Sequence, residues 1–197
     1  MSQFSLWGYQ NQNGPHVWSK WFPIAKEGRR QSPINIDEDR CIQNANHIPL
    51  KLSYDPYAST TVENDGKCWR VATDPLLSCL SGGPLESDYQ LIHYEGHWGK
   101  MTGEGSEHTI NGEKFDAELQ LVHRRSNYSS TILALNEPDG LAIVSILLKV
   151  GQSHPEFNKL CMILNHVQRK GLHKDINTLK ISIENFFPKS KSYFSYS

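Results

Sequence analysis

The sequence predicts a strand-rich, mainly β protein that folds as one domain over residues 1–197. From Ile48 onward, short segments of alternating apolar and polar residues are separated by turn residues such as Asn, Asp, Gly and Pro. One stretch, Pro155–Lys170, instead has apolar residues at helical spacing. The length of 197 residues suits one compact domain, and no Pro/Gly/Ser-rich linker divides the chain.

Turn residues set the order of the predicted strands. Residues 1–35 are rich in Gly, Pro, Asn and Trp, and we expect an irregular segment pinned by aromatic side chains there. Asn64-Asp65-Gly66 and Asn111-Gly112 each separate two alternating segments, which is typical of hairpins. The predicted strands are 50–54, 60–63, 67–72, 89–98, 108–110, 115–123 and 141–150.

Two segments have patterns that also predict their surroundings. Leu141–Val150 is a continuous apolar run between Gly140 and Gly151, which is typical of a central strand buried on both faces. The helical spacing of Pro155–Lys170 predicts a helix, and Gly171 predicts its end.

The charge balance excludes several classes of function. Twenty basic residues against 21 acidic ones leave a net charge of −1, so we expect neither a nucleic-acid binder nor a membrane-surface binder.

The N-terminus lacks the basic and apolar regions of a signal peptide, and no apolar run reaches the roughly 20 residues of a membrane span. The four cysteines have no CxxC spacing, which favours reduced thiols and leaves a disulfide as the open alternative. We therefore expect a cytoplasmic protein.

Nine His residues prompt a search for a metal site. If 89–98 is a strand, His93, Glu95 and His97 point to one face. Neighbours on that face are about 6.6 Å apart, so Glu95 and His97 can reach one metal ion, whereas His93 and His97 are about 13 Å apart. A third ligand would come from the strand 115–123, one face of which carries Glu118, Gln120 and Val122.

The metal chemistry of this set is weak. Gln is a poor zinc ligand, because its neutral amide oxygen is a weaker donor than imidazole. Zinc with one hydroxide and three imidazoles keeps a net positive charge, whereas a Glu/His/Gln site is neutral, so its bound water would have a higher pKa. A hydrogen-bonded polar face without metal is therefore the main alternative interpretation of His97 and its neighbours.

The order of motifs along the chain resembles that of the alpha-carbonic anhydrase family over nearly the whole length. In the first part, the matching stretches are Trp7-Gly8-Tyr9, Asn13-Gly14-Pro15, Phe22-Pro23-Ile24-Ala25 and Gln31-Ser32-Pro33-Ile34-Asn35-Ile36. Further along they are Asn64-Asp65-Gly66, Gly82-Gly83-Pro84-Leu85, His97-Trp98-Gly99, Gly105-Ser106-Glu107-His108-Thr109, Leu121-Val122-His123 and Pro138-Asp139-Gly140-Leu141-Ala142. Many motifs in one order leave little room for coincidence.

The resemblance implies a fold and a metal site. It implies a single domain around a large, mostly antiparallel sheet with a few helices. It also implies reversible hydration of carbon dioxide to bicarbonate by a hydroxide on zinc, which three His hold. The family's ligand positions carry Glu95, His97 and Gln120 here, so two of the three His are replaced. Gly96 stands where the family has a bulky apolar residue, and we expect it to loosen the strand and to pack against nothing.

Other functional positions of the family carry over one at a time. Glu107 matches the Glu that accepts a hydrogen bond from the Thr that orients the zinc hydroxide. Glu118 matches the acid that orients the third His, a role that we expect to lapse beside Gln120. Lys67 stands at the proton-shuttle position, where an ammonium group exchanges protons poorly near pH 7. The positions that match the substrate pocket and the water network are Val122, Ile143 and Tyr9.

The end of the chain departs from the family pattern. Phe187-Pro188 and Tyr193-Phe194-Ser195-Tyr196 resemble the family's L-P-x-x-x-x-Y-W-T-Y stretch. The next segment of the family, G-S-x-T-x-P-P with the hydroxide-orienting Thr, does not follow. We therefore expect a C-terminally truncated domain with an unpaired sheet edge.

These observations favour a carbonic-anhydrase-related protein with a degraded zinc site, little or no hydratase activity, and a role in binding an unknown protein partner. The first alternative is a weak zinc-dependent carbonate dehydratase, a lyase that acts on CO2 and bicarbonate with Glu95, His97 and Gln120 as ligands. The second alternative is a truncated product without a stable fold or function. Zinc is expected only in the first alternative.

Overall fold

The computed structural model describes residues 7–44, 48–190 and 192–197, and the chain divides into two compact units, one up to Ile34 and one from Asn35 to Tyr196. The first unit holds two short helices, α1 (Pro15–Trp21) and α2 (Ile24–Glu27). Three of its aromatic rings meet edge to face with centroids 6.0 to 6.5 Å apart, those of Trp7, Tyr9 and Trp18. Aromatic contacts thus pin this segment as predicted, although it also contains helices. That residues 1–197 form one domain stays a prediction.

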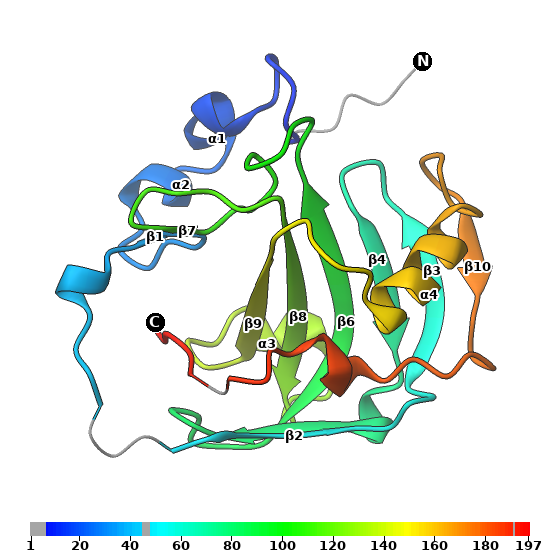
Figure 1. Cartoon of the computed structure of the whole chain (residues 1–197). Coiled ribbons are helices and arrows are strands. Elements are labelled where there is room, and N and C mark those ends of the chain that lie inside the picture. The colour runs from blue at the N-terminus through cyan, green and yellow to red at the C-terminus, as the bar shows by residue number, and fades with distance from the viewer. Residues whose placement is uncertain (1–6, 45–47, 191) are drawn as a thin grey trace. The chain divides into compact units, whose positions relative to one another are not determined.

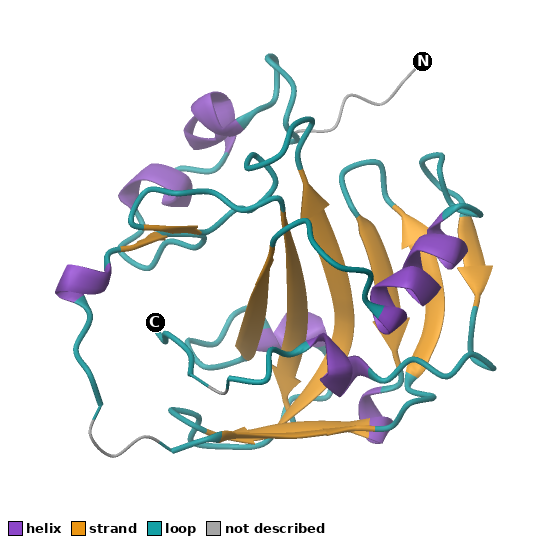
Figure 2. Cartoon of the chain, viewed as in Figure 1, coloured by secondary structure: helices purple, strands orange, loops and turns teal. Residues whose placement is uncertain are grey.

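The second unit is built on strands (Figures 1 and 2). They are β1 (Asn35–Ile36), β2 (Leu50–Tyr54), β3 (Ser59–Asn64), β4 (Trp69–Thr73), β5 (Ser78–Gly82), β6 (Tyr89–Trp98), β7 (Thr109–Ile110), β8 (Ala117–Arg125), β9 (Leu141–Leu148) and β10 (His173–Asp175). Within the described residues, eight of them form one curled sheet in the order β10-β3-β4-β6-β5-β2, with β8 paired to β6 and β9 paired to β8. Every pair in this sheet is antiparallel, whereas β1 and β7 form a small parallel pair. The predicted mainly β fold around a large antiparallel sheet is confirmed.

Helices are short in this unit. They are α3 (Thr131–Ala134), α4 (Pro155–Leu164) and the 3-10 helices η1 (Glu38–Arg40), η2 (Pro75–Leu77) and η3 (Ile183–Phe186). The prediction that the helix from Pro155 continues to Lys170 is wrong, because α4 ends at Leu164. Asn64 Nδ2 donates to the Val167 carbonyl oxygen (3.0 Å), and the Gly171 N–H donates to the Asn64 carbonyl oxygen (2.7 Å), so the chain turns here toward the end of β3. In the described segments, no helix is long and apolar enough to cross a membrane.

The prediction that 141–150 is a central strand buried on both faces is also wrong. Among the strands described, β9 pairs with β8 alone, so it forms an edge of the sheet. Ile146 packs in the core with Val144 and Leu148, whereas Ile143 on the other face is 51% exposed. The apolar run shows that the strand has apolar side chains on both of its faces. It does not show which strands lie beside it in the sheet.

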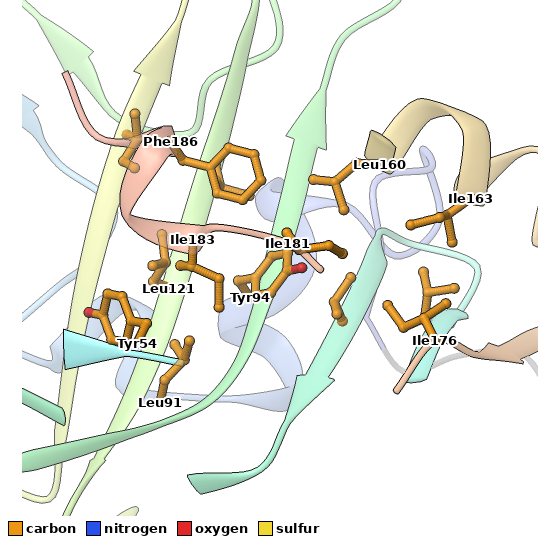
Figure 3. Close-up of a cluster of buried hydrophobic side chains, with 14 of the residues drawn as sticks. Tyr54, Leu91, Tyr94, Leu121, Leu160, Ile163, Ile176, Ile181, Ile183 and Phe186 are labelled. Carbon is orange, nitrogen blue, oxygen red and sulfur yellow. The ribbon is translucent and has the colours of Figure 1, made fainter. Parts of the chain in front are cut away.

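The core lies on one face of the sheet, against α4 and η3. Tyr94 of β6 and Leu121 of β8 are fully buried there, and Leu160 of α4 and Phe186 of η3 pack in the same cluster (Figure 3). Burying each such side chain stabilises the fold by about 1.5–3 kcal/mol. Successive residues of a strand point to opposite faces, so the neighbours of Tyr94 and Leu121 along β6 and β8 lie on the face away from the core.

Gly96 is required for the packing of Trp69, which corrects the expectation that it packs against nothing. The two residues are opposite each other in the β4–β6 pair, and a Cβ atom at Gly96 would overlap the Trp69 ring. The indole therefore covers the glycine and packs beside Tyr94, with ring centroids 6.4 Å apart.

We predict that G96A lowers the free energy of unfolding by about 1–3 kcal/mol, because the added methyl group displaces Trp69. G151A is the matched control, since a Cβ atom at Gly151 would have its nearest neighbour at 4.0 Å. The control should change the free energy of unfolding by less than about 0.5 kcal/mol. Urea denaturation measures both variants, and equal losses would contradict the packing argument.

His123 is fully buried on the core face as a neutral imidazole. Its Nδ1–H donates to the Ala142 carbonyl oxygen (3.1 Å), so its Nε2 accepts from the Tyr54 hydroxyl (2.8 Å). Burial lowers the pKa of His123 to about 4, against the opposing effect of the Ala142 and Leu121 carbonyl groups. The His123 imidazole therefore stays neutral in the folded chain at pH values at which the same imidazole takes up a proton in the unfolded chain.

We predict that His123 makes the fold about 2 kcal/mol less stable at pH 5 than at pH 7. The unfolded side chain protonates below a pH of about 6.5, and the folded one only near its pKa of about 4, so stability falls as the pH falls through this window. His93, whose pKa burial also lowers to about 4, contributes with the same sign. Urea unfolding at the two pH values should show a weaker pH dependence in H123Q than in wild type and in the exposed-site control H173Q. Identical pH dependences in all three would contradict the prediction.

Candidate functional site

The residues at the three predicted ligand positions, Glu95, His97 and Gln120, lie on the face of the sheet opposite the core. Arg70 of β4 is opposite Glu95 of β6, and Glu95 is opposite Gln120 of β8. His97 is opposite Glu118 in the same β6–β8 pair. Opposite residues of an antiparallel pair share a face, so these five side chains form one polar surface, which we call the site face.

Glu95 is bonded to an arginine. Arg70 donates from Nε (2.9 Å) and from Nη2 (2.8 Å) to Glu95 Oε2. Cys68 Sγ and His93 Nε2 each lie 3.6 Å from the same oxygen. Burial would raise the pKa of Glu95, but His97 and the bonds from Arg70 lower it to about 2, so the carboxylate is ionised. No local pattern around Arg70 or Cys68 predicts these contacts, because they depend on the pairing of β4 with β6.

His97 lies between two carboxylates. Its Nε2 is 3.5 Å from Glu95 Oε1, and its Nδ1 is 3.6 Å from Glu107 Oε1. The Nε2 atom is buried, and the residues that the structure describes offer it no hydrogen-bond partner. Burial lowers the pKa of His97, but Glu95, Glu107 and Glu118 raise it by more, so the net shift is upward. These carboxylates therefore favour protonation of His97 relative to a free imidazole.

Gln120 directs its amide nitrogen toward carboxylates. It donates from Nε2 to Glu107 Oε2 (3.0 Å) and to Glu118 Oε1 (2.9 Å). Glu118 thus accepts a hydrogen bond from the amide nitrogen at position 120. That its family role of orienting a His lapses beside Gln120 stays a prediction.

Glu118 is fully buried and joins the site face to the loop before β8. The backbone N–H groups of Glu107 and His108 donate to its Oε2, both at 2.9 Å, and His108 Nδ1–H donates to its Oε1 at 2.7 Å. His108 Nε2 in turn accepts from the Tyr196 hydroxyl (2.6 Å). Burial would raise the pKa of Glu118, but the bonds from His108 and Gln120 hold it at about 2. The ionised carboxylate thus fixes this loop in place.

The other predicted site residues are spread more widely. Lys67 is half-buried in the turn before β4, where its N–H donates to Asp65 Oδ1 (2.8 Å). Val122 and Ile143 are opposite each other in the β8–β9 pair, on the same side of the sheet as Glu95. Tyr9 belongs to the N-terminal unit, and its place at the site stays a prediction.

The residues at the ligand positions do not fit the zinc that the family resemblance implies. Zinc takes lone pairs from neutral imidazole, thiolate or carboxylate. Here the Glu95 carboxylate is bonded to a guanidinium, the amide nitrogen of Gln120 faces carboxylates, and His97 is the one His of the three. Across the described residues there is no group of three or more His, Cys, Asp or Glu side chains placed to hold a metal. The site face is instead a network of ion pairs and hydrogen bonds.

We predict that E118Q lowers the free energy of unfolding by about 2–4 kcal/mol. An amide at this position turns an NH2 group toward N–H donors, which leaves buried donors without an acceptor. E113Q, at an exposed position in the turn after β7, is the matched control and should change the free energy of unfolding by less than about 0.5 kcal/mol. If E118Q is no less stable than E113Q in urea, the network around Glu118 does not stabilise the fold.

Comparison of the sequence with known proteins shows the family of this chain. Residues 13–197 match the family described as eukaryotic-type carbonic anhydrase. The chain is 40% identical over 192 residues to carbonic anhydrase 3 of Sus scrofa, and the alignment covers 96% of this chain and 73% of that protein. It is 39% identical over 193 residues to carbonic anhydrase 1 of Mus musculus, with the same two coverages. The chain therefore belongs to the alpha, or eukaryotic-type, carbonic anhydrase family.

Proposed function

We propose that this chain is a carbonic-anhydrase-related protein that holds no catalytic zinc and hydrates carbon dioxide little or not at all. The observation that carries the proposal is the pair of hydrogen bonds from Arg70 to Glu95, at 2.9 and 2.8 Å. A metal ion at this ligand position would have to displace a guanidinium from a largely buried carboxylate to which it is bonded twice. Without the metal, no hydroxide forms at neutral pH to attack carbon dioxide.

Two further positions support a loss of turnover. Gln120 uses its amide nitrogen as a donor to Glu107 and Glu118, so its orientation serves the carboxylates and not a metal. Lys67 stands where the family has its proton-shuttle His, and an ammonium group is a poor relay near pH 7. Even a zinc ion bound weakly at this face would lack a fast route for the proton that hydration releases.

We propose that the chain acts by binding a protein partner. The support for this role is that the sheet and the family's motifs are kept while the ligand positions are changed. Val122 and Ile143 stand at the positions that match the family's substrate pocket. In a chain that only binds a partner, they would not hold carbon dioxide for a reaction. The cytoplasmic location stays a prediction.

Zinc content separates the proposal from its first alternative. We expect the full chain, loaded with zinc chloride and then desalted, to retain far less than one zinc per chain, and to leave CO2 hydration at its uncatalysed rate in a stopped-flow assay. A family member with three His ligands is the positive control for both measurements.

Each alternative has its own signature in these measurements. One tightly held zinc per chain, with chelator-sensitive hydration that H97A abolishes and H173A keeps, would contradict the proposal and establish a weak carbonate dehydratase. Urea unfolding without a cooperative transition would instead favour a product without a stable fold.

A further inference from the structure

Negative charge is concentrated around the site face. Glu95, Glu107 and Glu118 all lie there, and His97 lies 3.5 Å from the first and 3.6 Å from the second. The Arg70 side chain is 34% exposed and that of Glu95 is 14% exposed, so their ion pair lies largely out of water. A carboxylate in such a place is costly without a cation beside it.

We infer that the Arg70 guanidinium takes the place of a divalent metal beside Glu95 and thereby keeps metal ions out of the site face. The inference rests on the proposed function, because it concerns a chain that holds no zinc at this face. A guanidinium that donates twice to Glu95 Oε2 supplies the positive charge that the carboxylate requires. A zinc ion on the same oxygen would lie about 2.0–2.2 Å from it, close enough to Arg70 for strong repulsion between the two cations.

A thiol and an imidazole lie near this carboxylate, each beside a different one of its two oxygens, although the three groups are not placed around one metal position in the structure. Cys68 Sγ lies 3.6 Å from Glu95 Oε2, and His97 Nε2 lies 3.5 Å from Glu95 Oε1. With bonds of about 2.0–2.3 Å, two ligands of a tetrahedral zinc are about 3.3–3.7 Å apart. With Arg70 removed, the Glu95 carboxylate would be free to offer an oxygen to zinc, and Cys68 and His97 are the neighbouring donors that would have to rotate onto the same ion.

A purely structural role for the ion pair is the competing explanation, because Arg70 and Glu95 are also opposite residues of β4 and β6. Both explanations predict that loss of Arg70 destabilises the fold. They differ in the response to metal. If Arg70 excludes metal, zinc should bind and stabilise a chain without Arg70, whereas a structural link alone predicts no effect of zinc.

The test compares three full-length chains, wild type, R70M and R70M/E95Q, after treatment with a chelator and with or without added zinc chloride. We expect R70M to melt about 5 °C below wild type without zinc, because Glu95 loses its cation. Added zinc should restore most of this loss, and R70M should retain at least about tenfold more zinc than wild type after desalting. R70M/E95Q lacks both charges and is the matched control, so zinc should leave its melting temperature unchanged.

The outcomes separate this inference from the proposed function. If zinc leaves the melting temperature of R70M unchanged, or raises that of R70M/E95Q by as much, Arg70 does not exclude metal, and the proposed function is unaffected. One zinc per chain retained by wild type would instead overturn the proposed function. R70Q, which is polar and uncharged, replaces R70M if the latter does not fold, and the same zinc response is expected of it.

Discussion

The pairing of β6 between β4 and β8 is the constraint on which the rest of the site depends. This register places Arg70, Glu95 and Gln120 in one row across three strands, on the face away from the core. Each side chain of that row is bonded to a charged partner. Arg70 neutralises Glu95, and the Gln120 amide donates to the carboxylates of Glu107 and Glu118. The two larger sets of polar contacts on this face are therefore made within the chain, while the buried His97 Nε2 has no hydrogen-bond partner among the described residues.

The same strand pair links the site to the core. Trp69 and Arg70 are consecutive on β4 and point to opposite faces of the sheet. Trp69 covers Gly96 among the core side chains, while Arg70 bonds to Glu95, which precedes Gly96 on β6. The small residue at position 96 therefore allows close contact on one face at the same place where the ion pair forms on the other. A change that moved the indole would also shift the backbone that carries the guanidinium.

Features set by local chemistry could be predicted from the sequence, and features set by distant partners could not. Alternation and turn residues predicted β2 and β6 at their observed bounds and β8 within two residues, because pleating and turn conformation are local properties. The same alternation correctly placed Glu95 and His97 on one face of β6. The edge position of β9 and the early end of α4 depend on partners remote in sequence, such as Asn64 for the turn at Val167. The motif order predicted Glu95, His97 and Gln120 as the ligand positions but could not predict their contacts, since Arg70 lies 25 residues from Glu95 and meets it only through strand pairing.

The two replaced His ligands and the presence of Arg70 belong to one electrostatic arrangement. Imidazoles at positions 95 and 120 would leave the Arg70 guanidinium without its carboxylate and beside the new ligands, where it would oppose the binding of any second cation. Glu118 would not have to change, since its Oε1 already accepts a hydrogen bond from the side chain at position 120. The positive charge beside Glu95 is thus supplied by Arg70, a residue outside the three predicted ligand positions.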